Sequence, residues 1–146
     1  MICGNTLKNC KVRSAQTAYN DADQAFVAAG SPITILGVKA TDTGIAIDTE
    51  PTVFNINASG IYRISYDVDL TAGGAGVVTL QLYDGLNPLP CSVAARTVAT
   101  DLEYAIHVET VLALSACRAV HHAIGARISG VAGNITHVCA SCVKLG

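Results

Sequence analysis

Charged residues and large aromatic side chains are scarce in this sequence. Its 146 residues include no tryptophan, two phenylalanines and one methionine, and only 14% are charged, compared with about 25% in an average soluble domain. In contrast, 51% of the residues are apolar. A domain of this length can build one core without disulfides or metals, but so much apolar surface needs a further cover. We expect that cover to be another protein chain, most simply a second copy of this one.

Long apolar runs and clusters of basic residues are also lacking. No stretch approaches the roughly 20 apolar residues of a membrane-spanning helix, and the run Val111–Leu114 is preceded by His107 and Glu109. The net charge is −2 and Lys and Arg are scattered, so the basic stripe that nucleic-acid binding needs is missing. We therefore expect neither a membrane nor a nucleic acid as partner. The N-terminus has no apolar signal-peptide core, which predicts synthesis in the cytoplasm.

Sequence signatures of the common enzyme classes are absent. The chain has no nucleophile elbow, no phosphate-binding loop, no dinucleotide fingerprint and no HExxH zinc motif. We therefore predict that it is not an enzyme. No cofactor is expected, and no catalytic, cofactor-binding or metal-ligating residues are assigned.

The histidines and one pair of aspartates are the remaining candidates for chemistry. His121 and His122 are adjacent, so on a strand they point to opposite faces and cannot chelate one metal together. We expect ordinary packing or surface roles for the histidines; the alternative is that some converge on a three-fold axis and bind a metal. Asp67 and Asp69 share one strand face, where carboxylates bind Ca²⁺ or act as acid and base, but a solvated outer face is the preferred interpretation.

Six cysteines do not by themselves predict disulfides here. They are Cys3, Cys10, Cys91, Cys117, Cys139 and Cys142. Without a secretion signal they are expected to be mostly reduced and to act as small apolar side chains. Two alternatives remain, namely zinc bound through the CxxC of Cys139 and Cys142, and an oxidised pair such as Cys3 with Cys10.

Alternation of apolar and polar residues is the dominant pattern and predicts strands. Gly60–Leu70 places Tyr62, Ile64 and Tyr66 on one face, with Arg63 and the two aspartates on the other. The same alternation predicts inward Leu80 and Leu82 before the turn pair Asp84-Gly85. Further strands are expected at Glu103–Leu114, Ala119–Ile128 and Asn134–Leu145, and less regular ones at Ala25–Ala28, Ile33–Val38, Gly44–Ile47 and Thr52–Ile56. This pattern predicts an all-β antiparallel sandwich or jelly roll, preceded by an arm over residues 1–12.

The order of these segments resembles one known family. The chain resembles the TNF/C1q-like jelly roll over residues 13–146. The segments that carry the resemblance are, in order, FNINASGIYRISYDVDL, a Gly-rich turn, VVTLQLYDGLNPLP, a strand of small residues, YAIHVETVLALS and a terminal NITHVCASCVKLG. The sequence looks closest to versions found in bacteriophage head-fibre or capsid decoration proteins and on bacterial spore surfaces. It departs from the eukaryotic members in its few aromatic residues, and no collagen-like stalk precedes the domain.

The resemblance implies a non-enzymatic homotrimer with apolar strand faces around the three-fold axis. We expect the core and trimer strands to present Tyr62, Ile64, Tyr66, Val68, Leu80, Leu82, Ile106, Val108 and Leu112. The expected function is that of a structural virion protein, a capsid decoration or head-fibre protein that docks on the major capsid protein or another virion component. Docking would use arm residues Met1, Ile2, Cys3, Leu7 and Cys10. The alternative is a ligand- or receptor-binding module on a bacterial, spore or phage surface, with its site on the loops Gly73–Gly76, Asp84–Pro90 and Gly130–Gly133.

Overall fold

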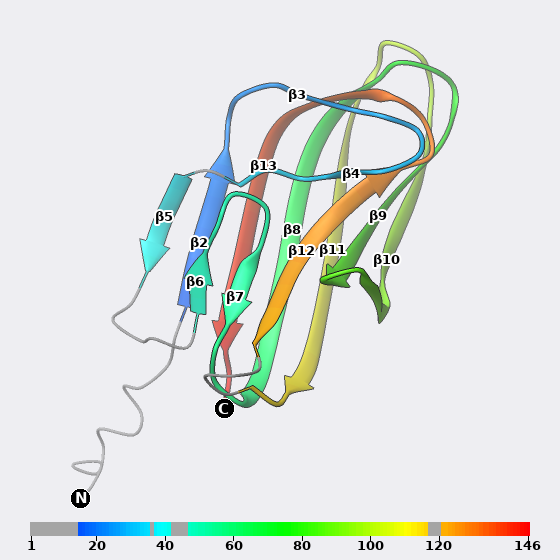
Figure 1. Ribbon diagram of the computed structural model, residues 1–146. Helices are drawn as coiled ribbons and strands as arrows, with labels where there is room; N and C mark the ends of the chain where they lie inside the picture. Colours follow the sequence, from blue (N-terminus) through cyan, green and yellow to red (C-terminus); the bar gives the residue numbers. More distant parts are fainter. Residues whose placement is uncertain (1–14, 36, 42–46, 117–120) are drawn as a thin grey trace, which may run out of the picture.

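Two antiparallel six-stranded sheets lie face to face in the computed structural model of the chain (Figure 1), which describes residues 15–35, 37–41, 47–116 and 121–146, the side chains of 37–41 apart. The first sheet runs in the order β10 (Asn87–Val98), β9 (Gly76–Asp84), β12 (His122–Ser129), β7 (Phe54–Ile56) and β6 (Ile47–Thr49), with β4 (Ser31–Pro32) also paired to β12. The second runs in the order β11 (Glu103–Leu114), β8 (Gly60–Ala72), β13 (Gly133–Lys144), β2 (Ala15–Asn20) and β5 (Gly37–Thr41), with β3 (Gln24–Phe26) paired to β13. The predicted all-β antiparallel sandwich is therefore confirmed.

Strand β8 shows how the alternating pattern builds the core. Its residues alternate between buried and exposed along the whole strand, because successive side chains point to opposite faces of a sheet. Tyr66 contacts Phe54 of the facing sheet edge to face, with ring centroids 6.3 Å apart. The residues predicted for the core and trimer strands are buried within the single chain, except Leu112, which is partly buried against the same core. Their contribution to a trimer seam stays a prediction.

Two of the predicted segments need correction. Ile33–Val38 is not one strand, because β4 ends at Pro32 and β5 begins at Gly37. Between them the chain passes from one sheet to the other with Ile33 and Ile35 buried. Asp84–Pro90 is not a loop either, since β10 already begins at Asn87 and a short turn with Gly85 at φ 62° connects it to β9.

The crossing between the sheets is held by amide side chains together with backbone hydrogen bonds, since the Ile33 N–H donates to the Ala126 carbonyl of β12 at 3.0 Å and the Ile35 N–H to the Pro51 carbonyl at 2.6 Å. The Thr34 N–H donates to Gln24 Oε1 at 2.9 Å, and the Thr34 carbonyl accepts from Gln24 Nε2 at 3.0 Å and from Asn20 Nδ2 at 3.1 Å. A backbone segment without a strand partner still needs its polar groups paired. The two amides pair the backbone of Thr34, and backbone carbonyls accept from Ile33 and Ile35, so the buried crossing keeps these polar groups satisfied.

Other differences lie at the ends of elements. The alternating pattern did not predict β2. The strand residues that it predicted at 44–46 and 119–120 lie outside the described residues, as does the predicted arm. β6 begins at Ile47, and Thr52–Ile56 shortens to Phe54–Ile56. Within the described residues there is no helix of the length and apolar character needed to cross a membrane.

Candidate functional site

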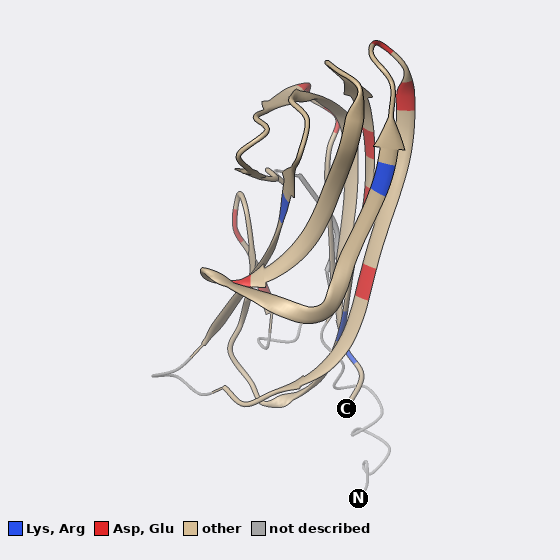
Figure 2. Cartoon of the chain, turned by 90° about the vertical axis from the view of Figure 1, so that its right-hand side faces the viewer, with Lys and Arg blue, Asp and Glu red and all other residues tan. Residues whose placement is uncertain are grey.

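The outward side of the second sheet, here called the histidine face, carries a set of paired polar side chains. It consists of the β8, β11 and β13 residues that alternate with the buried ones. Arg63, Asp67 and Asp69 lie on β8, and His107, Glu109 and Val111 on β11. The registers pair Asp67 with both His107 and Cys139, and Ser65 with both Glu109 and Ser141. Most of the ribbon is uncharged, and acidic residues lie at separate points along it (Figure 2).

His107 lies between two carboxylates on this face. Its Nδ1 is 2.7 Å from Asp67 Oδ1 across the strand pair, and its Nε2 is 3.5 Å from Glu109 Oε1 two residues along β11. All three side chains are about half exposed or more. Solvated pairs of this kind contribute little to stability. Because the three side chains are exposed, they are accessible for contact with another molecule.

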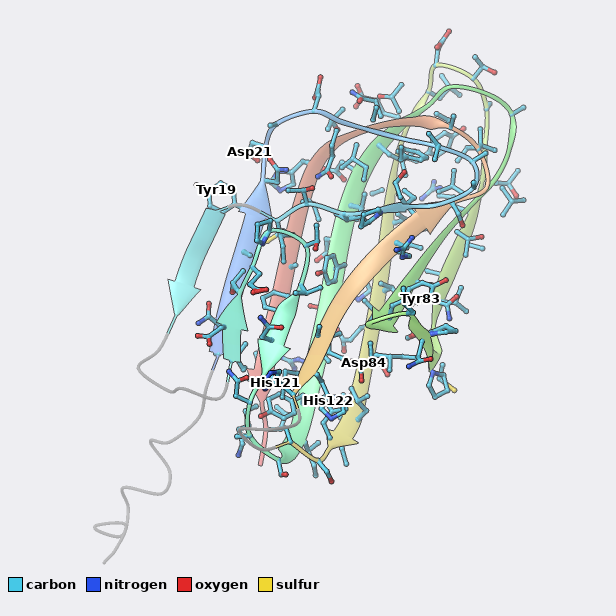
Figure 3. The ribbon with its side chains drawn as sticks, in the orientation of Figure 1. Tyr19, Asp21, Tyr83, Asp84, His121 and His122 are labelled. Carbon is cyan, nitrogen blue, oxygen red and sulfur yellow. The ribbon has the colours of Figure 1, made fainter. Side chains whose placement is uncertain are left out.

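A second histidine pair and a hydroxyl pair extend the face across β13. His137 Nδ1 contacts Asp21 Oδ1, which lies just after β2, near Tyr19 (Figure 3). Ser65 and Ser141 share a hydrogen bond of 2.8 Å between their hydroxyl oxygens. The part of the histidine face around His107, His137 and the two serines is therefore polar, and these side chains are paired with neighbours on the same face.

The opposite end of the same face consists of apolar residues around the exposed Arg63. Ile61 of β8 is directly opposite Ala113 of β11, and Val111 and Val143 flank Arg63 from the two neighbouring strands. Ile61 is 46% exposed and Val111 54% exposed. Leu145 lies beside Ile61, because its backbone N–H donates to the Ile61 carbonyl. These five apolar residues, Ile61, Val111, Ala113, Val143 and Leu145, are called the apolar end.

A third histidine pair closes one end of the core rather than facing outward. His122 Nδ1 is 2.6 Å from Asp84 Oδ2, and its Nε2 is 2.8 Å from the Ser115 carbonyl oxygen; Asp84 and His122 lie close together in Figure 3. A carbonyl and an ionised carboxylate only accept hydrogen bonds, so both contacts are hydrogen bonds when the ring is protonated and both of its nitrogens donate. The bond to Asp84 is the main cause that raises the pKa of His122, partly opposed by burial.

This arrangement has a clear chemical consequence. With both nitrogens donating, His122 presents no lone pair to a substrate, and a general base needs one. The Asp84–His122 pair is therefore a structural connection between β9, β12 and the end of β11.

The cysteines and carboxylates of the described residues do not gather into a metal site. No group of three or more His, Cys, Asp or Glu side chains within the described ranges is placed to hold a metal ion. Cys142 is buried, which raises the pKa of its thiol to about 12, whereas Cys139 is partly exposed. The two thiols lie on opposite faces of β13, because successive side chains of a strand alternate. Cys139 and Cys142 are therefore not placed to bind one zinc ion together. Cys91, Cys139 and Cys142 are free thiols.

Sequence reasoning identified the faces but missed the pairs. It placed Asp67 and Asp69 outward, and both are exposed. It did not foresee that His107, His122 and His137 each meet an aspartate distant in sequence. These partners follow from strand register, and the alternating pattern of one strand carries no information about its register with the next.

Comparison with known proteins agrees with this architecture. The sequence matches no protein-family model and no curated protein. Among solved structures, murine APRIL at pH 5.0 superposes with a TM-score of 0.70 at 13% identity, covering 91% of this chain and 99% of the other. The globular domain of zebrafish complement 1qA gives 0.66 at 9% identity over 91% and 98%, and Eiger TNF from S. frugiperda gives 0.64 at 10% identity over 92% and 92%.

At these identities the likeness concerns the fold. The relationship to phage and spore-surface proteins, which was predicted from the sequence, is not addressed by these three structures and stays a prediction. The chain has the TNF/C1q-like jelly-roll fold over nearly its whole length.

Proposed function

We propose that this chain is a non-enzymatic module that assembles as a homotrimer through its histidine face. The observation that carries the proposal is the apolar end of that face, where the exposed Ile61 and Val111 and the neighbouring apolar side chains of β11 and β13 surround Arg63 of β8. Arginine is itself enriched in protein interfaces. A contiguous exposed apolar patch marks an interaction surface. A copy of the same chain is the simplest occupant, since 51% of the residues are apolar.

The outward side of the other sheet provides a contrast within the same molecule. Val77 and Val93 are exposed there to 50% and 56%, as much as Val111. Each is opposite a polar residue, since Val77 is paired with Thr97 and Val93 with Gln81, whereas Ile61 of the apolar end is opposite Ala113. Exposed valines that stand singly are ordinary on a protein surface. The outward side of the first sheet therefore gives no comparable indication of an interface.

The test places a charge on each of the two faces. Val111→Lys introduces an ammonium into the apolar end and should convert the trimer to monomer at micromolar concentration, because an uncompensated charge in a protein interface is unfavourable. Val93→Lys is the matched control and should remain trimeric. Sedimentation velocity or light scattering measures both masses.

Two outcomes contradict the proposal. A wild-type protein that is monomeric throughout the micromolar range would show that no such assembly exists. Dissociation by Val93→Lys with Val111→Lys unaffected would show that the other face forms the contact. Circular dichroism of each variant distinguishes dissociation from unfolding.

A narrower form of the proposal assigns the trimer to a virion. It rests on the sequence resemblance to capsid decoration and head-fibre proteins and on the predicted arm, with the major capsid protein as partner and the virion as location. The alternative, a ligand- or receptor-binding module, is favoured by the fold shared with a complement 1qA globular domain and with a TNF. Both forms need the same trimer.

A further inference from the structure

A hollow of about 220 Å³ lies on the outward side of the first sheet, the side away from the histidine face. It forms where β7 ends along the edge of β12 and β4 begins, so that β12 pairs with β7 at residues 122–124 and with β4 at residues 127–128. Between these two partners, the edge of β12 that faces away from β9 has no paired strand at residues 125–126. Its lining residues are Pro32, Thr52, Val53, Tyr83, Gly85, Ala123, Gly125, Ala126 and Arg127.

The floor of the hollow depends on a glycine. A Cβ at position 125 would collide with the Thr52 carbonyl oxygen and would press on the Val53 side chain. Only glycine therefore allows the segment before β7 to lie so close to β12 and to form one wall. Pro32, Val53 and Ala123 make the rest of the lining largely apolar.

Arg127 provides the single cationic group of this hollow. Its guanidinium carbon lies 5.7 Å from the centroid of the Tyr83 ring on the neighbouring strand β9. No carboxylate within the described part of the chain forms a salt bridge with it. The nearest acidic residue along β9 is Asp84, and its carboxylate is already bonded to His122 and to the Ala123 N–H.

We propose that this hollow binds a small carboxylate ligand with a compact apolar body. A guanidinium offers parallel N–H donors that match the two oxygens of a carboxylate, and stacking on Tyr83 holds the fork in place before a ligand arrives. The hollow is smaller than the roughly 300–1,000 Å³ of a drug-sized site, which limits the occupant to one compact group. The apolar lining receives its body.

Benzoate is the probe, and benzamide is its neutral counterpart of nearly the same shape. Titration into ¹⁵N-labelled protein should give saturable shifts of the amide signals of Tyr83, Gly85, Ala123 and Gly125, with a dissociation constant of roughly 1–10 mM for so small a ligand. Benzamide should bind at least about tenfold more weakly, because it lacks the charge-assisted contact.

Three variants test whether binding depends on the charge of Arg127, on its planar guanidinium and on its position in the hollow. Arg127→Gln should weaken benzoate binding at least about tenfold, and Arg127→Lys should fall in between because it keeps the charge and loses the planar fork. Arg96→Gln is the matched control. Arg96 also lies over a tyrosine, 5.0 Å from the Tyr104 centroid, but its Nη1 already donates to the Ala105 carbonyl and it does not line the hollow.

Three results would each overturn the proposal. They are the absence of saturable shifts up to roughly 50 mM benzoate, equal binding of benzamide, and unchanged binding by Arg127→Gln. The measurement is independent of the trimer, since the hollow lies on the other sheet. Val111→Lys should therefore bind benzoate as the wild type does, whether or not it assembles.

Discussion

At the scale of single residues, two core tyrosines differ in what their hydroxyls meet. The Tyr62 hydroxyl donates to the Ala58 carbonyl at 2.6 Å. The Tyr66 hydroxyl is fully buried and has no hydrogen-bond partner within the described residues. Burial is the main cause that raises the pKa of both phenols, to about 12 for Tyr62. A buried polar group without a partner carries its full desolvation cost.

We predict that Tyr66→Phe stabilises the protein, by about 1 kcal/mol, because it removes the unpaired hydroxyl and keeps the ring that packs on Phe54. Tyr62→Phe is the matched change and should destabilise by about 1 kcal/mol, since it leaves the Ala58 carbonyl without its donor. Urea unfolding at one protein concentration measures both. Destabilisation by Tyr66→Phe would mean that its hydroxyl has a partner after all.

The sequence predicted which way these side chains point but not what they meet. Alternation along Gly60–Leu70 places Tyr62 and Tyr66 inward, and both are fully buried. The two tyrosines occupy equivalent positions in that pattern. Their difference arises from the loop residue Ala58 and from the facing sheet, which are tertiary features that a local pattern does not contain.

At the scale of elements, the Asp84–His122–Ser115 connection joins β9, β12 and the end of β11. Its pH dependence follows from the direction of the pKa shift. Because the folded-state pKa of His122 is raised above its usual 6.5, the stabilisation is fully present below about pH 6.5 and is lost as the pH rises through the folded-state pKa. Deprotonation leaves one ring proton, so only one of the two acceptors keeps its donor.

We predict that His122→Gln destabilises the protein by about 1–3 kcal/mol near pH 5.5, and that the difference from wild type shrinks above the folded-state pKa. The adjacent His121 is exposed, so His121→Gln is the control and should change stability by less than about 0.5 kcal/mol at every pH. Urea unfolding across pH 5.5–8.5 provides the comparison. A destabilisation that is the same at all pH values would assign a purely steric role to His122.

Elements were predicted well where alternation is long and poorly where tertiary contacts replace it. Glu103–Leu114 alternates over twelve residues, and β11 has the same bounds. The apolar isoleucines of Ile33–Val38 suggest a strand, yet Ile33 and Ile35 are buried in a crossing. Its backbone is paired by the Gln24 and Asn20 amides and by carbonyls outside any regular strand register. The pattern reports burial, and burial alone does not distinguish a strand from a crossing.

At the scale of the whole molecule, the two outward faces have separate properties. The histidine face ends in an apolar patch suited to another copy of the chain, and the opposite sheet carries the Arg127 hollow. A trimer formed through the first face leaves the second in contact with solvent. The proposed assembly and the proposed ligand binding therefore use different surfaces of the molecule.

The predicted N-terminal arm, residues 1–12, provides the last test of how the molecule is used. The described core begins at Ala18, so deletion of residues 2–11 should leave the thermal unfolding and the mass of the trimer nearly unchanged. If the arm docks the trimer on a virion, the same deletion should abolish co-sedimentation with purified phage particles that carry the protein. Calorimetry and sedimentation on one truncated protein give both answers. A large loss of stability with particle binding retained would instead mean that the arm packs on its own trimer.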